Sequence, residues 1–80
     1  MMDMEKKPPC LFGNILVAAR EKRGLKQAEL ARRCGRDPRY ISQLETGRRE
    51  PLISTVVMLA RALEMKAGEL ANEMDNALPK

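Results

Sequence analysis

The chain has 80 residues and a formal net charge of +4 at pH 7. That length supports one small domain, and the sequence holds no apolar run long enough for a membrane span and no apolar signal segment. With no His and two cysteines, Cys10 and Cys34, it offers neither a metal-ligand set nor a disulfide framework. Its scattered carboxylates form no recognisable catalytic set. We therefore expect a cytoplasmic protein that is not an enzyme and needs no cofactor.

The positive charge is concentrated in the middle of the chain. Residues 20 to 49 hold ten Arg and Lys against four Asp and Glu, a net +6, whereas residues 50 to 80 hold three basic and five acidic residues, a net −2. The basic stretch is a candidate surface for a polyanion. The charge distribution alone is weak evidence for polyanion binding, because most charged helix faces are only solvated.

The start of the chain divides into an arm and two helices. Residues 1–9 are polar, end in two prolines and have no periodicity, so we expect a flexible arm. From Leu11 the apolar residues recur at helical spacing as far as Gly24, which readily adopts the left-handed conformation at a helix end. A shorter amphipathic run at 27–34 ends at Gly35. The residues expected to face the core from these two helices are Phe12, Ile15, Leu16, Ala19, Leu30, Ala31 and Cys34.

The stretch "DPRYISQLETGRR" predicts a third helix with both ends marked. Asp37 accepts hydrogen bonds from free backbone N–H groups, and Pro38 fits the first helical position. Ile41 and Leu44 are expected to point inward, three residues apart, before Gly47 ends the helix.

Two further apolar patterns at helical spacing complete the chain. Their residues are Ile53, Val56, Val57, Leu59, Ala60 and Leu63, and then Ala67, Leu70, Ala71 and Met74. No strand pattern or repeat is present, so we predict an all-α fold, a compact bundle of five short helices over residues 10–75, with a frayed tail at 76–80. Three helix starts, at Lys26, Leu52 and Lys66, lack a Ser, Thr or Asn cap, which predicts modest stability.

The second and third predicted helices have the spacing of a helix-turn-helix, in which the second helix lies in the DNA major groove. The close crossing of the two helices requires a small residue, which is Ala31. Four residues later Gly35 provides a permissive turn, and six residues beyond that Ile41 fills the angle between the helices.

Residues 12–70 resemble the Cro-type, lambda-repressor-like helix-turn-helix domain of the XRE family of transcriptional regulators. The resemblance rests on the segments "LFGNILVAAREKRGLKQAELARRCG", "YISQLETGRREP" and "VVMLARALEM". It implies a recognition helix at about residues 38–46. It also implies a partly buried ion pair between Arg20 and Glu45 that links the first helix to the third.

The same resemblance implies DNA contacts for seven residues: Gln27, Arg39, Tyr40, Ser42, Gln43, Arg48 and Arg49. Gln27 would bind a phosphate at the start of the second helix. Arg39, Ser42 and Gln43 would face the bases, where Gln pairs with adenine and Arg with guanine. Tyr40 would reach a phosphate or a thymine methyl, and the two arginines after the glycine would clamp the backbone.

Each of these residues also has a plainer interpretation as ordinary helix surface or loop charge. Arg36, in the turn, and Arg32 and Arg33, on the outer face of the second helix, are expected to add no more than positive field. Pro38 departs from the family, which often has a polar, base-contacting side chain there. Cys34 is interpreted as a small core residue.

A domain of this type is expected to bind a palindromic operator as a homodimer, because two recognition helices discriminate better than one. Met58, Met65, Leu70 and Met74 mark either a dimer face on the C-terminal helices or simply the filling of a small core. The alternative is a protein-interaction module, antitoxin-like or a co-regulator, with DNA binding secondary.

Overall fold

The computed structural model describes residues 11–77, with side chains from Phe12 to Glu73. Within this range there are five helices and no strands. The bounds are α1 (Leu11–Lys22), α2 (Gln27–Cys34), α3 (Pro38–Thr46), α4 (Ile53–Ala62) and α5 (Ala67–Ala77). The prediction of an all-α bundle of five short helices is therefore confirmed. The expected arm at 1–9 lies outside the described residues.

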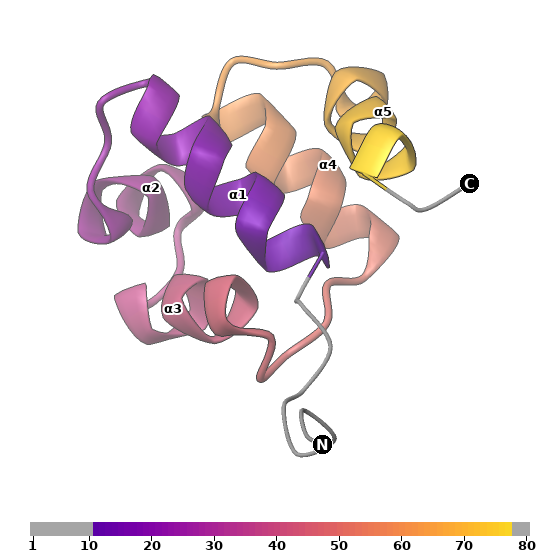
Figure 1. Cartoon of the computed structure of the whole chain (residues 1–80). Coiled ribbons are helices and arrows are strands. Elements are labelled where there is room, and N and C mark those ends of the chain that lie inside the picture. The colour runs from indigo at the N-terminus through magenta and orange to yellow at the C-terminus, as the bar shows by residue number, and fades with distance from the viewer. Residues whose placement is uncertain (1–10, 78–80) are drawn as a thin grey trace, which may run out of the picture.

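The helices close into a ring of contacts around one core. In Figure 1, α1 and α4 run through the middle of the molecule, α2 and α3 lie to one side, and α5 lies to the other. Helix α1 packs against α3 and α5, α2 packs against α3 and α4, and α4 packs against α5. The buried apolar residues are Phe12, Leu16, Leu30, Ala31, Ile41, Leu44, Leu59, Ala60, Leu63 and Leu70. Burying each large aliphatic side chain stabilises the fold by about 1.5 to 3 kcal/mol.

The ends of α3 follow the sequence signals. Asp37 accepts a hydrogen bond from the backbone N–H of Arg39 through Oδ1 at 2.8 Å, and Pro38 occupies the first turn. Gly47 has φ of 83°, a conformation that glycine adopts without a side-chain clash. Helix α3 therefore begins and ends where the sequence predicted.

The starts of α2 and α5 are better satisfied than we expected. The side chains of Lys26 and Lys66 cannot accept a hydrogen bond, but their backbone N–H groups donate to the carboxylates of Glu29 and Glu69, each at 2.8 Å. This is one half of a capping box. Only Leu52, before α4, lacks a side-chain cap altogether, as expected.

Three predicted positions differ in the structure. Ile53 is 84% exposed, because it begins α4 beyond the edge of the core, and the adjacent Leu52 is 71% exposed. Leu70 is fully buried, so it fills the core and is not free to form a dimer face, whereas Met65 packs against the core and also lines the groove between α1 and α5. Helix α5 continues to Ala77, past the predicted start of the tail, because no helix breaker precedes Pro79. None of the five helices in the described range has the length and hydropathy that a membrane crossing requires.

Glu64 is the one non-glycine residue with positive φ, 60°, in the described part of the chain. It follows α4 in a Schellman motif: its N–H donates to the carbonyl of Arg61 at 3.0 Å, and the N–H of Met65 donates to Ala60 at 2.7 Å. The left-handed conformation costs a residue with a Cβ about 1 to 2 kcal/mol.

We predict that Glu64→Gly raises the free energy of unfolding by about 0.5 to 1 kcal/mol, after allowance for the greater entropy of glycine in the unfolded chain. Urea denaturation measures this difference. The control is Glu64→Ala, which removes the same charge but retains Cβ and should gain nothing. An equal gain in both variants would assign the effect to charge rather than to backbone conformation.

Candidate nucleic-acid interface

A buried carboxylate joins the helices that build the candidate site. Glu45 on α3 is only 8% exposed. It accepts hydrogen bonds from Arg20 on α1, Nε to Oε2 at 2.6 Å and Nη2 to Oε1 at 3.3 Å, and from Gln27 Nε2 on α2, to Oε1 at 2.7 Å. Arg20 Nη1 also donates to the carbonyl of Leu25 at 2.8 Å. Three helices are therefore held by one charged group whose burial is compensated by these donors.

Helices α2 and α3 form the helix-turn-helix unit. Ala31 and Ile41 are buried where the two helices pack together, and Gly35 between them has φ of 68°. The N–H of Arg36 donates to the carbonyl of Ala31 at 2.9 Å, which closes the end of α2. The three positions that the spacing argument required therefore occupy the crossing and the turn.

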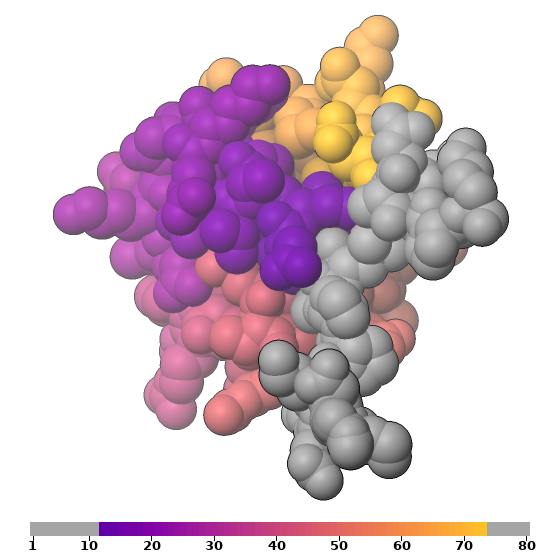
Figure 2. Space-filling view, in the orientation of Figure 1, coloured from indigo at the N-terminus to yellow at the C-terminus, as the bar shows by residue number. Residues whose placement is uncertain are grey.

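The face of α3 opposite the core carries the predicted base-reading residues. Arg39 is exposed, and its side chain is 88% accessible; its contact with Asp37 is 4.0 Å between two exposed groups and contributes little. Ser42 and Gln43 are half-buried on the same helix. In Figure 2 the surface of α3 lies at the lower edge of the molecule, away from α5. Of these three residues, Arg39 has the side chain that is most accessible to a partner.

The loop after α3 is tied to the helix through Gln43. The carbonyl oxygen of Gln43 accepts hydrogen bonds from the N–H groups of Arg48, at 2.9 Å, and Arg49, at 3.2 Å. Arg49 Nε also donates to Gln43 Oε1 at 3.1 Å. Both arginines are exposed; the backbone of both is held at the end of α3, and the side chain of Arg49 is also held beside the outer face of the helix.

Tyr40 connects α3 to the rest of the molecule instead of pointing outward. Its hydroxyl and that of Thr55 on α4 are 3.1 Å apart and hydrogen-bonded. The guanidinium carbons of Arg36 and Arg49 lie 4.9 and 5.4 Å from the centre of its ring, which is cation–π geometry. The structure therefore gives Tyr40 a positioning role that sequence reasoning missed.

A family model described as Helix-turn-helix matches residues 16–70, which is more than half of the chain. The chain belongs to this helix-turn-helix family. It is 39% identical over 74 residues to an HTH-type transcriptional regulator of Sinorhizobium fredii, y4dJ, a match that covers 92% of this chain and 91% of that protein.

Two solved structures of gene regulators are similar to this helix-turn-helix protein. The clp gene regulator ClgR from C. glutamicum has a TM-score of 0.81 and 25% identity, covering 91% of this chain and 97% of that one. The restriction-modification controller protein C.AhdI from Aeromonas hydrophila has a TM-score of 0.73 and 34% identity, covering 76% and 92%. The chain is therefore a helix-turn-helix transcriptional regulator.

Gln27 in this helix-turn-helix regulator is not free in the way the resemblance implied. Its amide nitrogen is held by Glu45, so the side chain belongs to the internal network. The backbone N–H groups at the start of α2 are the remaining means by which this position can bind a phosphate.

Arg33, which was expected only to add positive field, and Arg23, which the sequence did not single out, both have structural roles. Arg33 donates to the carbonyl of Ala62 at 3.0 Å, and Arg23 donates to the carbonyl of Leu63. Both satisfy carbonyl groups at the end of α4. No local sequence signal indicates these contacts, because the partners are 29 and 40 residues apart.

Cys34 is a free thiol packed against the core. Burial raises its pKa above the ordinary value, and the nearby charge of Arg36 opposes that shift. A raised pKa lowers the thiolate fraction, which suits a core residue better than a reactive one.

We predict that Tyr40→Phe lowers the free energy of unfolding by about 1 kcal/mol, because it leaves the Thr55 hydroxyl, in a residue 5% exposed, without this partner. Denaturation in urea measures the change. Thr55→Val should have a similar effect, and the double variant should lose little more than either single one. Strictly additive losses would show that the two hydroxyls do not interact.

Proposed function

We propose that this regulator binds a palindromic operator as a homodimer, with α3 lying in the major groove. The observation that carries the proposal is the outer face of α3, where Arg39, Ser42 and Gln43 stand on a helix whose opposite face is fixed by Glu45. A rigid helix that displays hydrogen-bonding side chains is what direct reading of base edges requires. In this proposal the protein binds DNA without catalysing a reaction, and it does so in the cytoplasm.

Phosphate contacts are expected to supply most of the affinity. Arg48 and Arg49 flank the recognition helix, and the start of α2 offers backbone N–H groups on the same side of the helix-turn-helix. Residues 20 to 49 carry a net charge of +6, and Arg36, Arg39, Arg48 and Arg49 lie on α3 or in the turns at its two ends, so the field there favours a polyanion. Binding should therefore weaken steeply as salt rises.

The two similar solved structures are named as a clp gene regulator and a restriction-modification controller. By likeness to them, we propose that this chain controls transcription of a small set of genes, acting as a Cro-like repressor when it occupies a promoter.

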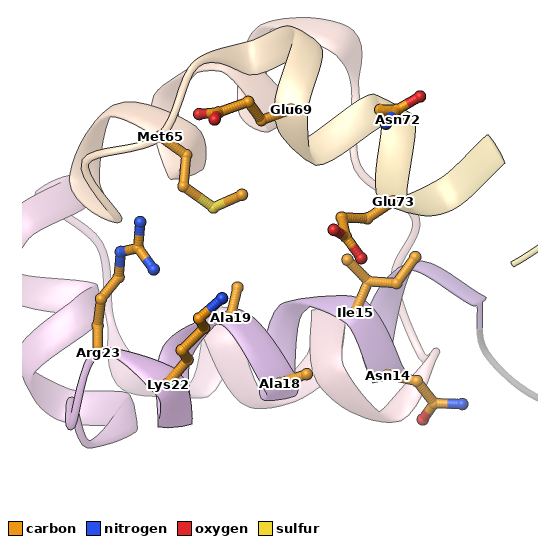
Figure 3. A pocket seen from close by; sticks show the side chains of 10 residues that line it. All are labelled: Asn14, Ile15, Ala18, Ala19, Lys22, Arg23, Met65, Glu69, Asn72 and Glu73. Atoms are coloured by element: carbon orange, nitrogen blue, oxygen red, sulfur yellow. The ribbon is translucent and has the colours of Figure 1, made fainter. Parts of the chain in front are cut away.

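The groove between α1 and α5, about 610 Å³, supports dimerisation through the C-terminal helix. Figure 3 shows Lys22 and Arg23 on its α1 side and Glu69 and Glu73 on its α5 side. A twofold axis through the groove would bring the basic side of one copy against the acidic side of the other. This charge pattern favours a second copy of the chain as the occupant.

One observation favours the alternative function, a protein-interaction module. Leu52 and Ile53 are adjacent apolar residues that are 71% and 84% exposed, at the point where the loop after α3 enters α4. Adjacent exposed aliphatic side chains of this size are typical of protein contacts. A protein partner would therefore bind close to the DNA face.

Selection of bound sites from random duplex DNA tests the proposal. We expect an inverted repeat whose half-sites are about one helical turn apart. Arg39→Ala should then weaken binding to the selected site by about 1 to 3 kcal/mol and relax one base position. Gel shifts at about 0.1 M salt measure both effects.

The matched control is Arg61→Ala, which removes the same charge from an exposed position on α4. It should leave the base preference unchanged. Absence of binding to any duplex at this salt would overturn the DNA-binding proposal in favour of the protein-interaction module, and a selected motif without symmetry would overturn the homodimer.

A further inference from the structure

The amide oxygen of Gln43, the group that would accept a hydrogen bond from adenine, already accepts one within the protein. Arg49 Nε donates to it at 3.1 Å. Two other contacts fix the arginine there: its backbone N–H donates to the Gln43 carbonyl at 3.2 Å, and its guanidinium lies 5.4 Å from the centre of the Tyr40 ring. Gln43 and Arg49 therefore present a single hydrogen-bonding unit to a partner.

This unit presents more donors than acceptors, because Arg49 Nε takes one of the two lone pairs of Gln43 Oε1. A glutamine pairs bidentately with adenine by donating to N7 and accepting from the N6 amino group, and the second bond needs Oε1. An amino group that approached Oε1 would also approach the positive guanidinium of Arg49, and both groups carry donor hydrogens. What remains is the Nε2 group of Gln43 and the free nitrogens of Arg49. Guanine best matches a pair of donors, because it offers two adjacent acceptors, O6 and N7, whereas thymine offers O4 alone and adenine offers N7 alone.

We infer that Arg49 determines the base preference of Gln43, so that Gln43 contacts a keto group rather than the amino group of adenine. Arg49 thereby acts as a positioning residue for specificity from a loop that was expected only to clamp phosphates. This inference rests on the proposed function, because it assumes that α3 lies in the major groove.

Base analogues that alter one exocyclic group and keep the Watson–Crick hydrogen at the ring nitrogen test the inference. Every base pair has one keto oxygen and one amino group in the major groove, so either can be altered at the position that Gln43→Ala relaxes. For a G·C pair, 6-thioguanine replaces O6 by sulfur, a weaker acceptor, and 2-pyrimidinone removes the cytosine amino group. For a T·A pair, 4-thiothymine replaces O4 by sulfur and purine removes the adenine amino group.

With the unchanged protein, replacement of the keto oxygen by sulfur should weaken binding about 10-fold, and removal of the amino group should change it less than about 2-fold. Arg49→Met frees Oε1 of Gln43. On a site selected from random DNA with this variant, removal of the amino group should be the change that weakens binding. The reverse pattern in the unchanged protein would overturn the inference. So would a Gln43→Ala variant that relaxes no position.

The matched control is Arg48→Met. Arg48 is the neighbouring exposed loop arginine, and no hydrogen bond from its side chain is found among the described residues. Its replacement removes the same charge and should weaken binding to all duplexes without altering the effect of either base change. If Arg49→Met also leaves the effects of both base changes unaltered, the inference fails while DNA binding stands. If the unchanged protein binds no duplex, the proposed function fails and the inference with it.

Discussion

The carboxylate of Glu45 is the group on which the arrangement of this molecule depends. It lies 8% exposed at the junction of α1, α2 and α3 and is bound by Arg20 and Gln27. A buried charge is tolerated only where donors replace the lost water, so the three helices are constrained to the geometry that satisfies it. No buried side-chain nitrogen or oxygen in the described residues lacks a hydrogen-bond partner. The apolar core supplies the stability, and this network selects one orientation of α3.

That orientation gives each face of α3 a separate role. Ile41 and Leu44 anchor it in the core, and Tyr40 connects it sideways to α4 through Thr55. In the proposed function the outer face contacts bases, and the hydrogen bonds from the backbone N–H groups of Arg48 and Arg49 to the Gln43 carbonyl hold the loop after α3 beside it. Because the loop is bound both to the backbone and to the side chain of Gln43, positioning and readout are not independent in this domain.

The sequence predicted the helices well because their ends carry local signals, such as glycines at the left-handed positions and the Asp37–Pro38 start. It also predicted which faces are buried, since periodicity reports the face directly. The resemblance implied the pair Arg20 and Glu45, which is present in the structure. Periodicity does not identify the partner of a polar side chain, however. The engagement of Gln27 by Glu45, of Tyr40 by Thr55 and of Arg49 by Gln43 depends on side-chain geometry, and no spacing rule indicates it. The exposure of Ile53 was missed for a related reason, because the pattern cannot show where the core ends.

A double-mutant cycle at Arg20 and Glu45 tests most directly whether this network holds the recognition helix in place. Arg20→Met, Glu45→Met and the double variant would be compared by urea unfolding. Because each single change leaves a partly buried polar group without its partner, we expect each to cost about 3 kcal/mol, with a coupling energy of about 2 kcal/mol, so that the double variant loses much less than the sum. Additive losses, with no coupling energy, would contradict the central role assigned to the Glu45 carboxylate.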